Sequence, residues 1–206
     1  LLEPKHEIVS LADYRLRHAT YKSDPHLQAA HARAAWICVW DDHETANDAW
    51  LHGAENHQPE TEGDFAQRKA AALKAYYEWM PIREAAPGAL KEAIHRSFHF
   101  GDLASLMMVE TRLTGRTEPL AYDRDLTAKD GSDGEPVLDL DAFRAKLNDP
   151  ARDLMGAEQR DWLKRELAAS KAKGRPSQVL GNQVVMARVA GPDVSRTLTE
   201  AQVQGL

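Results

Sequence analysis

The sequence predicts a mixed α/β (α+β) fold, in which helices and strands both contribute to the core. Residues 65–80 place large apolar side chains at helical spacing and are followed by Pro81, which ends a helix. Residues 35–40 form a short aromatic and β-branched run, the composition of a strand buried on both faces. Residues 94–100 alternate between apolar and polar side chains, which is typical of a half-buried strand.

The composition excludes several classes of protein. A net charge of −6, from 26 Lys and Arg against 32 Asp and Glu, argues against nucleic-acid binding, which depends on clustered basic side chains. The longest apolar runs fall far short of the ~20 residues that span a bilayer, so we expect no transmembrane segment. The single cysteine, Cys38, excludes an internal disulfide, and we expect it to be an inert, small apolar residue of the strand.

Two helices are predicted in the N-terminal part of the chain. Residues 10–21 carry apolar side chains three and four positions apart, with Ser10 as the N-cap. Asp24 and Pro25 then form a second helix start that leads into residues 26–34. Two helices close together in the sequence are therefore expected to precede the strand.

The next elements are a loop, a helix and a hairpin. Residues 50–63 contain Pro, Gly and alternating acids and histidines, which indicates a loop before the helix at 65–80. Gly101 and Asp102 form the expected turn between strands at 94–100 and 103–109. The second of these strands ends at polar residues, Glu110-Thr111-Arg112.

The second half of the chain is predicted to be less regular. Residues 114–135 are polar and are expected to form an exposed excursion. The elements predicted after it are a helix at 141–147, a helix that starts at 154 and ends at Gly174, and a strand at 178–189.

Four ionisable residues follow the predicted strand at 35–40 directly: Asp41, Asp42, His43 and Glu44. Hard cations prefer carboxylate ligands, and imidazole can bind a metal or move a proton near neutral pH. Open α/β sheets place their ligand sites at the carboxyl ends of strands. Because successive side chains of an extended segment point to opposite sides, all four residues cannot bind one ion unless the chain bends at once.

On these residues alone, a solvated loop or a helix cap is an equally good interpretation. The apolar strand before the run favours a site, as do Trp40 and Trp50, which could wall a dry cleft. The other histidines lack the spacing of metal ligands and are expected to be surface or core groups, above all His52, His57, His95 and His99.

Several segments resemble the PhoD-like alkaline phosphatases, in matching order over most of the chain. The most specific is the motif Trp40-Asp41-Asp42-His43-Glu44. The other similar segments are residues 14–28, Asn47-Asp48, Arg68, residues 75–83, residues 98–112, residues 154–163 and Gln183.

The resemblance implies a metallophosphoesterase, with part of a two-sheet β-sandwich flanked by helices. The implied activity is hydrolysis of phosphate esters, as an alkaline phosphatase or phosphodiesterase, by a metal-activated water. The implied cofactors are iron and calcium, the implied partner is a phosphate-ester substrate, and the implied location is periplasmic or secreted. Neither the residues nor the resemblance predicts an oligomeric state.

The resemblance also implies roles for the residues of the motif. Asp42 would be a metal ligand and a catalytic residue, and His43 would contact the phosphate or protonate the leaving oxygen. Asp41 and Glu44 would orient these two neighbours. A carboxylate suits a hard cation, and a bound metal lowers the pKa of its water, so the residue types fit the implied chemistry.

Two residues outside the motif are implied to hold the substrate phosphate, Asn47 and Arg68. The planar guanidinium fork of arginine matches the oxygens of a phosphoryl group. The sequence departs from the family at Glu110, where an Asp is more common before Thr-Arg.

Two further metal motifs of the family have no counterpart among the 206 residues: a Gly-Asp-Tyr-type segment and a Gly-Asp-x-His-type segment. The chain also starts at Leu rather than Met. We therefore expect residues 1–189 to be the central part of a PhoD-like metallophosphatase domain, incomplete as an enzyme, and residues 190–206 to be a loosely ordered stretch. The alternative function is an inactive phosphatase relative, or a helical interaction module that binds a protein partner through residues 50–63 and 114–135.

Overall fold

The computed structural model describes residues 3–132 and 135–186. Its helices and strands are mixed along the chain, which confirms the predicted fold class. Their bounds are α1 Leu11–Lys22, α2 Pro25–Arg33, α3 Pro59–Glu62, α4 Phe65–Trp79, β1 Arg96–Phe100, β2 Ala104–Met108, α5 Tyr122–Asp125, β3 Ala128–Asp130, β4 Pro136–Leu138, α6 Leu140–Leu147, α7 Gly156–Ala172 and β5 Ser177–Gly181.

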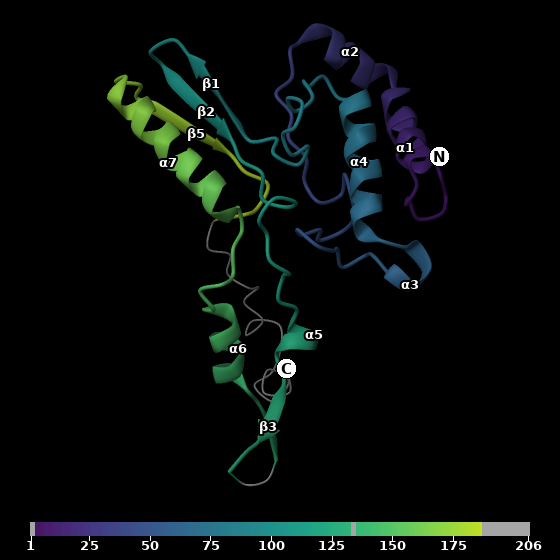
Figure 1. Ribbon diagram of the computed structural model, residues 1–206, viewed down its shortest axis with the longest axis vertical. Coiled ribbons are helices and arrows are strands. Elements are labelled where there is room, and N and C mark those ends of the chain that lie inside the picture. The colour runs from purple at the N-terminus through teal and green to yellow at the C-terminus, as the bar shows by residue number, and fades with distance from the viewer. Residues whose placement is uncertain (1–2, 133–134, 187–206) are drawn as a thin grey trace, which may run out of the picture.

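The elements form three parts (Figure 1). Helices α1, α2 and α4 lie together on one side, and the sheet β1-β2-β5 lies with α7 on the other. An arm that contains α5, α6 and the β3–β4 pair extends away from both. Among the described helices, none is long and apolar enough to cross a membrane.

The three-stranded sheet confirms the predicted hairpin. β1 and β2 pair antiparallel around the turn at Gly101, which has the positive φ of 56° that favours glycine. β5 then pairs parallel with β2 after the α7 crossover. Helix α7 contacts the sheet through Glu166, which accepts a hydrogen bond of 2.6 Å from the Ser97 hydroxyl. β1 and β5 are the outer strands of this sheet in the described part of the chain.

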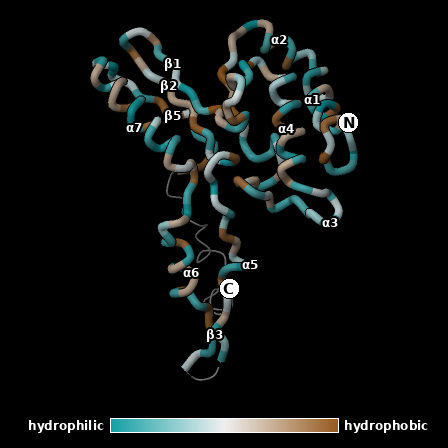
Figure 2. Tube along the Cα trace, in the orientation of Figure 1, coloured by the Kyte–Doolittle hydropathy of each residue, from teal (hydrophilic) through white to brown (hydrophobic). Residues whose placement is uncertain are grey.

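The predicted N-terminal helices are also confirmed. At the start of α1, Ser10 and Asp13 form a capping box, in which each side chain accepts from the other residue's backbone amide. Asp24 caps α2, and Pro25 occupies its first turn. Figure 2 shows apolar and polar residues interleaved along α1 and α4, which is the pattern of helices that bury one face.

The main core forms around Trp40, which is 1% exposed. Its indole ring makes edge-on contacts with Tyr76 and Tyr77 of α4, at centroid distances of 5.3 and 6.1 Å. A smaller cluster joins α1 to α4 through Tyr14 and two alanines of α4. Helix α4 therefore fixes both the N-terminal helices and the segment that leads into the Asp41–Glu44 run.

The strand predicted at 35–40 is wrong. Within the described residues this segment pairs with no strand, and Trp36 and Ile37 are 39% and 38% exposed. Only Cys38 and Trp40 are buried, so the segment packs one side against α4. Apolar composition indicates burial but does not specify a partner strand, and here a helix supplies the contact.

Three other regions differ from the sequence prediction. The loop at 50–63 contains the short helix α3, and the excursion at 114–135 contains α5 and the first strand of the β3–β4 pair. The strand predicted at 178–189 ends at Gly181 in β5, and its last three positions lie outside the described residues. The predicted loosely ordered stretch at 190–206 also lies outside them.

The start of α7 is joined to the segment after β2. Thr117 and Asp153 exchange backbone and side-chain hydrogen bonds of 3.0–3.3 Å. Beside them, the backbone of Gly115 lies against Gly156, so a Cβ at Gly115 would meet the Gly156 nitrogen at 2.2 Å and the Met155 carbonyl carbon at 2.4 Å. Only a residue without a side chain fits at this crossing.

We expect Gly115→Ala to destabilise the fold by about 1–3 kcal/mol, because the added methyl group meets backbone atoms that cannot rotate away. The measurement is the midpoint of urea unfolding followed by circular dichroism. An unchanged midpoint would show that the two segments separate without cost.

Asp153 gives the start of α7 a pH-dependent stability. Burial opposes its ionisation, but hydrogen bonds from Arg160 and from the amides of residues 154–156 outweigh burial and lower the pKa from 3.8 to about 2. The stabilisation is therefore complete above about pH 5 and is lost as the pH falls from about 4 to about 2.

We expect Asp153→Asn to lower the unfolding free energy at pH 7 by about 1–2 kcal/mol relative to the wild type. The difference should shrink below pH 4 and vanish near pH 2. Urea titrations at several pH values measure it, and a difference that does not depend on pH would contradict the assigned ionisation.

Candidate functional site

The Asp41–Glu44 run does not continue the extended segment before it. The amides of Thr45 and Ala46 both donate to the Asp42 carbonyl at 2.8 Å, so the chain turns at once. The turn separates two neighbouring side chains: Asp42 is 6% exposed, whereas His43 is largely exposed. The bend anticipated as an exception for this run is therefore what the structure shows.

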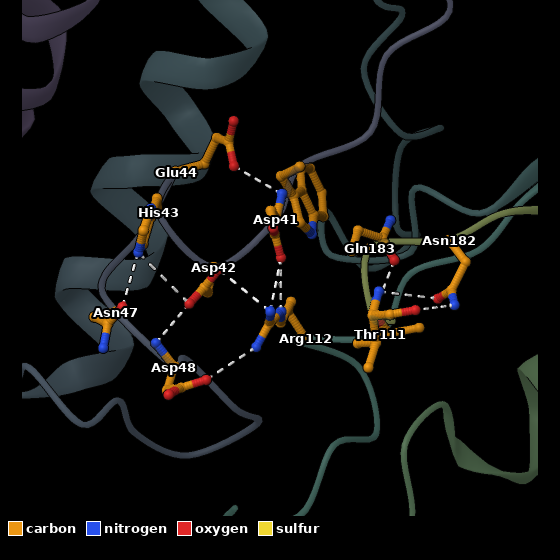
Figure 3. A network of polar contacts seen from close by, with 12 residues as sticks. Asp41, Asp42, His43, Glu44, Asn47, Asp48, Thr111, Arg112, Asn182 and Gln183 are labelled. Atoms are coloured by element: carbon orange, nitrogen blue, oxygen red, sulfur yellow. Dashed lines mark hydrogen bonds and ion pairs between the residues drawn. The ribbon is translucent and has the colours of Figure 1, made fainter. Parts of the chain in front are cut away.

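Arg112 gathers three carboxylates, those of the buried Asp42 and of the half-exposed Asp41 and Asp48 (Figure 3). Its guanidinium lies 2.9 Å from Asp41, 3.3 Å from Asp42 and 3.4 Å from Asp48. Arg112 follows β2 and is itself buried. The polar residues after β2 thus meet the Asp41–Glu44 run, although the segment before that run is not a strand.

Asp42 is held as a carboxylate. Its Oδ2 accepts a 2.6 Å hydrogen bond from the Asp48 amide, and its Oδ1 faces Arg112. Burial opposes ionisation, but the Asp48 amide and the Arg112 charge outweigh it, so the pKa of Asp42 lies below its ordinary value. Asp48 reaches this position with a positive φ of 48°, which Asp tolerates better than most residues.

Arg112 is positioned by Glu110, whose side chain is fully buried. Its carboxylate accepts from the Trp40 indole at 3.0 Å and from the Arg112 and Leu113 amides at 2.8 Å. The Thr114 amide and hydroxyl add bonds of 2.8 and 2.6 Å. Five donors therefore satisfy one buried charge and fix the turn after β2.

The backbone of Glu110 is held from α7. The side-chain amide of Gln159 accepts from the Glu110 amide at 2.8 Å and donates to the Glu110 carbonyl at 2.7 Å. Gln183, which follows β5, binds the residues on either side of Glu110. Its side-chain amide accepts from the Thr111 hydroxyl and donates to the Val109 carbonyl. The end of β2 is thus fixed by side chains from both following elements.

His43 stands on the exposed side of the turn with its ring fixed at one nitrogen. Nε2 lies 2.8 Å from the Asn47 Oδ1, and the Asn47 amide nitrogen donates to Glu55. Because a carboxylate accepts only, this bond orients Asn47 so that His43 Nε2 must donate, which leaves Nδ1 free to interact elsewhere. The Asn47 bond and the nearby Asp42 raise the pKa of His43.

An open hollow of about 410 Å³ brings together three of the predicted site residues: His43, Asn47 and Arg68. The segment before α1 forms another wall, through Lys5 and Glu7 among others. Asp42 does not line this hollow and lies behind His43, with 3.9 Å between its Oδ2 and the His43 Nε2.

Arg68 is buried, and all three guanidinium nitrogens are engaged. Nε donates to the Tyr14 hydroxyl at 3.1 Å, and Nη2 pairs with Glu7 at 3.0 Å. Nη1 donates to Glu62 and to the Asn56 carbonyl, both at 2.9 Å. The Tyr14 hydroxyl in turn donates to the Thr45 carbonyl, which joins Arg68 to the turn that carries His43.

Glu44 closes the turn from its other end. Its Oε2 accepts a 2.7 Å hydrogen bond from the Asp41 amide, and burial raises the pKa of its carboxyl group. This contact sets the backbone between Asp41 and His43. Of the two tryptophans expected to wall a cleft, Trp40 is core, whereas Trp50 lines a small hollow of about 110 Å³ together with Asp48 and Glu55.

The described residues do not form a complete metal site. Among them, no group of three or more His, Cys, Asp and Glu side chains is placed to hold an ion. Asp42 supplies one carboxylate, and Arg112 already neutralises part of its charge. A hard divalent cation needs more oxygen ligands than this.

Three residues central to the site do not stand out in the sequence: Glu110, Gln159 and Tyr14. The sequence indicates Glu110 only as one of the polar residues after a predicted strand and as a departure from an expected Asp. A weak signal existed, since an acid directly after an apolar strand faces burial. Gln159 and Tyr14 lie in amphipathic helices, where the pattern identifies the buried face but not a hydrogen-bond partner.

Comparisons with known proteins agree on one family. A family model described as PhoD-like phosphatase matches residues 1–205. Alkaline phosphatase D of Bacillus subtilis (strain 168) is 37% identical over 183 residues, which cover 88% of this chain and 28% of that protein. A solved structure of PhoD has a TM-score of 0.62 and 34% identity, and the match covers 86% of this chain and 30% of that one. The chain therefore spans less than a third of the length of these relatives.

We expect Glu110→Gln to lower the unfolding free energy by about 2–4 kcal/mol. Each carboxylate oxygen of Glu110 accepts from at least two donors, so the NH₂ group of Gln, in either orientation, would face donors that it cannot satisfy. Glu60→Gln is the matched control, because Glu60 is exposed, and should change stability by less than about 0.5 kcal/mol. Urea unfolding measures both. Equal stability of the two variants would show that the buried carboxylate is dispensable.

Proposed function

This chain belongs to the PhoD-like phosphatase family, and on that premise we propose that it is the central part of a metal-dependent phosphate-ester hydrolase. The observation that carries the proposal is the hollow at which His43, Asn47 and Arg68 meet, beside a buried, ionised Asp42. Residues 1–189 would form this central part. The alternative, an inactive relative or a protein-binding module, has no comparable support.

His43 would contact the substrate phosphate or protonate the leaving oxygen. Its Nε2 is committed to Asn47, so Nδ1 is the atom available to the substrate. The raised pKa of the ring increases the fraction that carries a second proton near neutral pH. A protonated ring attracts an anionic phosphate and can supply a proton to the departing oxygen.

Asn47 and Arg68 would hold the phosphate. Asn47 lines the hollow and orients the His43 ring, so it can position the His43 Nδ1 atom toward a bound phosphate. On Arg68, the Nη2 atom pairs with Glu7, whose side chain is more exposed than that of Glu62, the other acid that pairs with Arg68. A phosphate oxygen would replace the Glu7 carboxylate there, which exchanges one anion for another on the same guanidinium.

Asp42 would be a metal ligand, with Asp41 and Glu44 holding the turn that presents it. Iron and calcium are the metals proposed, on the family resemblance, and a bound metal supplies a water nucleophile at neutral pH. The described residues provide too few ligands, so the others would come from regions of the family domain beyond this chain. A periplasmic or secreted location is proposed on the same resemblance.

We expect the 206-residue chain alone to show little hydrolysis of p-nitrophenyl phosphate, because its ligand set is incomplete. The assay is release of p-nitrophenolate with added iron and calcium. Robust metal-dependent turnover that is lost in Asp42→Ala would show instead that the chain completes its own site.

In a full-length protein that carries this segment, we expect His43→Ala to lower kcat by about 10²–10⁴-fold. The loss should be greater for an alkyl phosphate than for p-nitrophenyl phosphate, because a poor leaving group needs the proton more. His52→Ala is the matched control, since His52 is exposed. An equal loss for both esters would assign His43 to phosphate binding rather than proton transfer.

Metal analysis of the same full-length protein separates the enzyme from the alternative. Stoichiometric iron or calcium, reduced in Asp42→Ala, supports the phosphatase. Absence of bound metal at every added concentration would favour a protein-binding module.

A further inference from the structure

A second hollow, of about 330 Å³, lies where the segment after β2 meets the start of α7. We propose that this hollow is a binding site for a phosphate group, separate from the hollow that carries His43. The two hollows share no lining residue. The inference does not use the roles proposed for His43, Asn47 and Arg68. The residues that line it are Arg116, Thr117, Pro119, Arg152, Asp153 and Leu154.

Arg116 is the first observation. In the described part of the chain its guanidinium has no hydrogen-bond or ion-pair partner, and its Nε is buried without one. Burial, and then repulsion from Arg112, lower the pKa of Arg116, although Asp48 and Asp42 partly offset them. A buried donor without an acceptor is costly, so an arginine held in this way indicates an anion that completes it.

Arg152 is the second observation, because it brings another guanidinium to the same hollow. Among the described residues its side chain also has no hydrogen bond or ion pair. Two cations thus line one small space. Arg124, by contrast, shows how other arginines of the chain are satisfied, since it pairs with both Glu118 and Asp125.

The acid in the hollow does not neutralise these cations. One oxygen of Asp153 accepts from the amides of Leu154, Met155 and Gly156, and the other pairs with Arg160. Both carboxylate oxygens of Asp153 are therefore engaged at the start of α7. The hollow therefore keeps a net positive charge.

The walls of the hollow are fixed before any ligand binds. The Thr117–Asp153 hydrogen bonds hold its two sides together, and the close crossing of Gly115 over Gly156 keeps them from moving closer. A rigid site loses little conformational freedom on binding. A guanidinium fork pairs with two oxygens of a phosphate or of a carboxylate, and a phosphate group offers two forks more oxygens than a carboxylate does.

The test uses the 206-residue chain and inorganic phosphate as the probe, at constant ionic strength set with NaCl. We expect a saturable rise in Tm and a saturable binding heat in the wild type. The double variant Arg116→Gln/Arg152→Gln should bind phosphate at least 10-fold more weakly. Arg165→Gln, which removes an exposed charge from α7, is the matched control and should bind as the wild type does.

Further variants separate this site from the other hollow. Because the proposed function places phosphate at Arg68 as well, the double variant is also made in an Arg68→Gln background, where the 10-fold loss of phosphate binding should persist. Phosphate binding in that background that does not depend on Arg116 and Arg152 would overturn the proposal, as would no binding to the wild type. If the double variant does not fold, Arg152→Gln and Arg116→Lys each give the same readout, the latter because it keeps the charge but loses the fork.

Phenyl phosphate and dimethyl phosphate distinguish the sources of the phosphate group. Phenyl phosphate binding as tightly as inorganic phosphate identifies a site for a phosphomonoester group of a larger ligand. Weaker binding of phenyl phosphate identifies a site for free phosphate. Tight binding of dimethyl phosphate alone would overturn the assignment of a dianion site.

Discussion

Glu110 lies just beyond the end of β2 and is fully buried. Its carboxylate accepts five hydrogen bonds, and its backbone is held by the Gln159 side chain from α7. An uncompensated charge at this depth would be strongly destabilising, so the surrounding donors have to be in place for the fold to exist. The same bonds fix the Arg112 backbone. The three carboxylates around Arg112 thus depend, through one residue, on the packing of α7 against the sheet and of Trp40 against α4.

The turn after Trp40 divides the chemistry of the site between two environments. On its inner side, Asp42 is buried, ionised and neutralised by Arg112. On its outer side, His43 faces an open hollow with a ring whose proton positions are set by Asn47. Because the chain turns between these two neighbouring residues, the Asp42 side chain lies in the interior and the His43 side chain lies at the hollow.

Much of this arrangement can be predicted from the sequence, and the exceptions have physical reasons. Capped, amphipathic helices such as α1 and α4 and the hairpin at Gly101 are specified by local patterns, and these were predicted correctly. The segment at 35–40 was predicted wrongly, because its apolar composition indicates that it is buried but not whether it packs against a strand or a helix. Glu110 and Gln159 act through bonds between residues 49 positions apart, which no local pattern records. The motif around His43 indicated which turn to consider as a candidate site, but the engagement of Arg68 by Tyr14 and Glu7 needed coordinates.

The sheet has a consequence for handling the isolated chain. In the described residues β5 is an outer strand, and its Val179 and Leu180 are 50% and 42% exposed. An outer strand with apolar side chains and unpaired backbone groups is a template for pairing with a strand from another molecule. Expressed by itself, the chain therefore presents an edge to which a strand of another molecule can add.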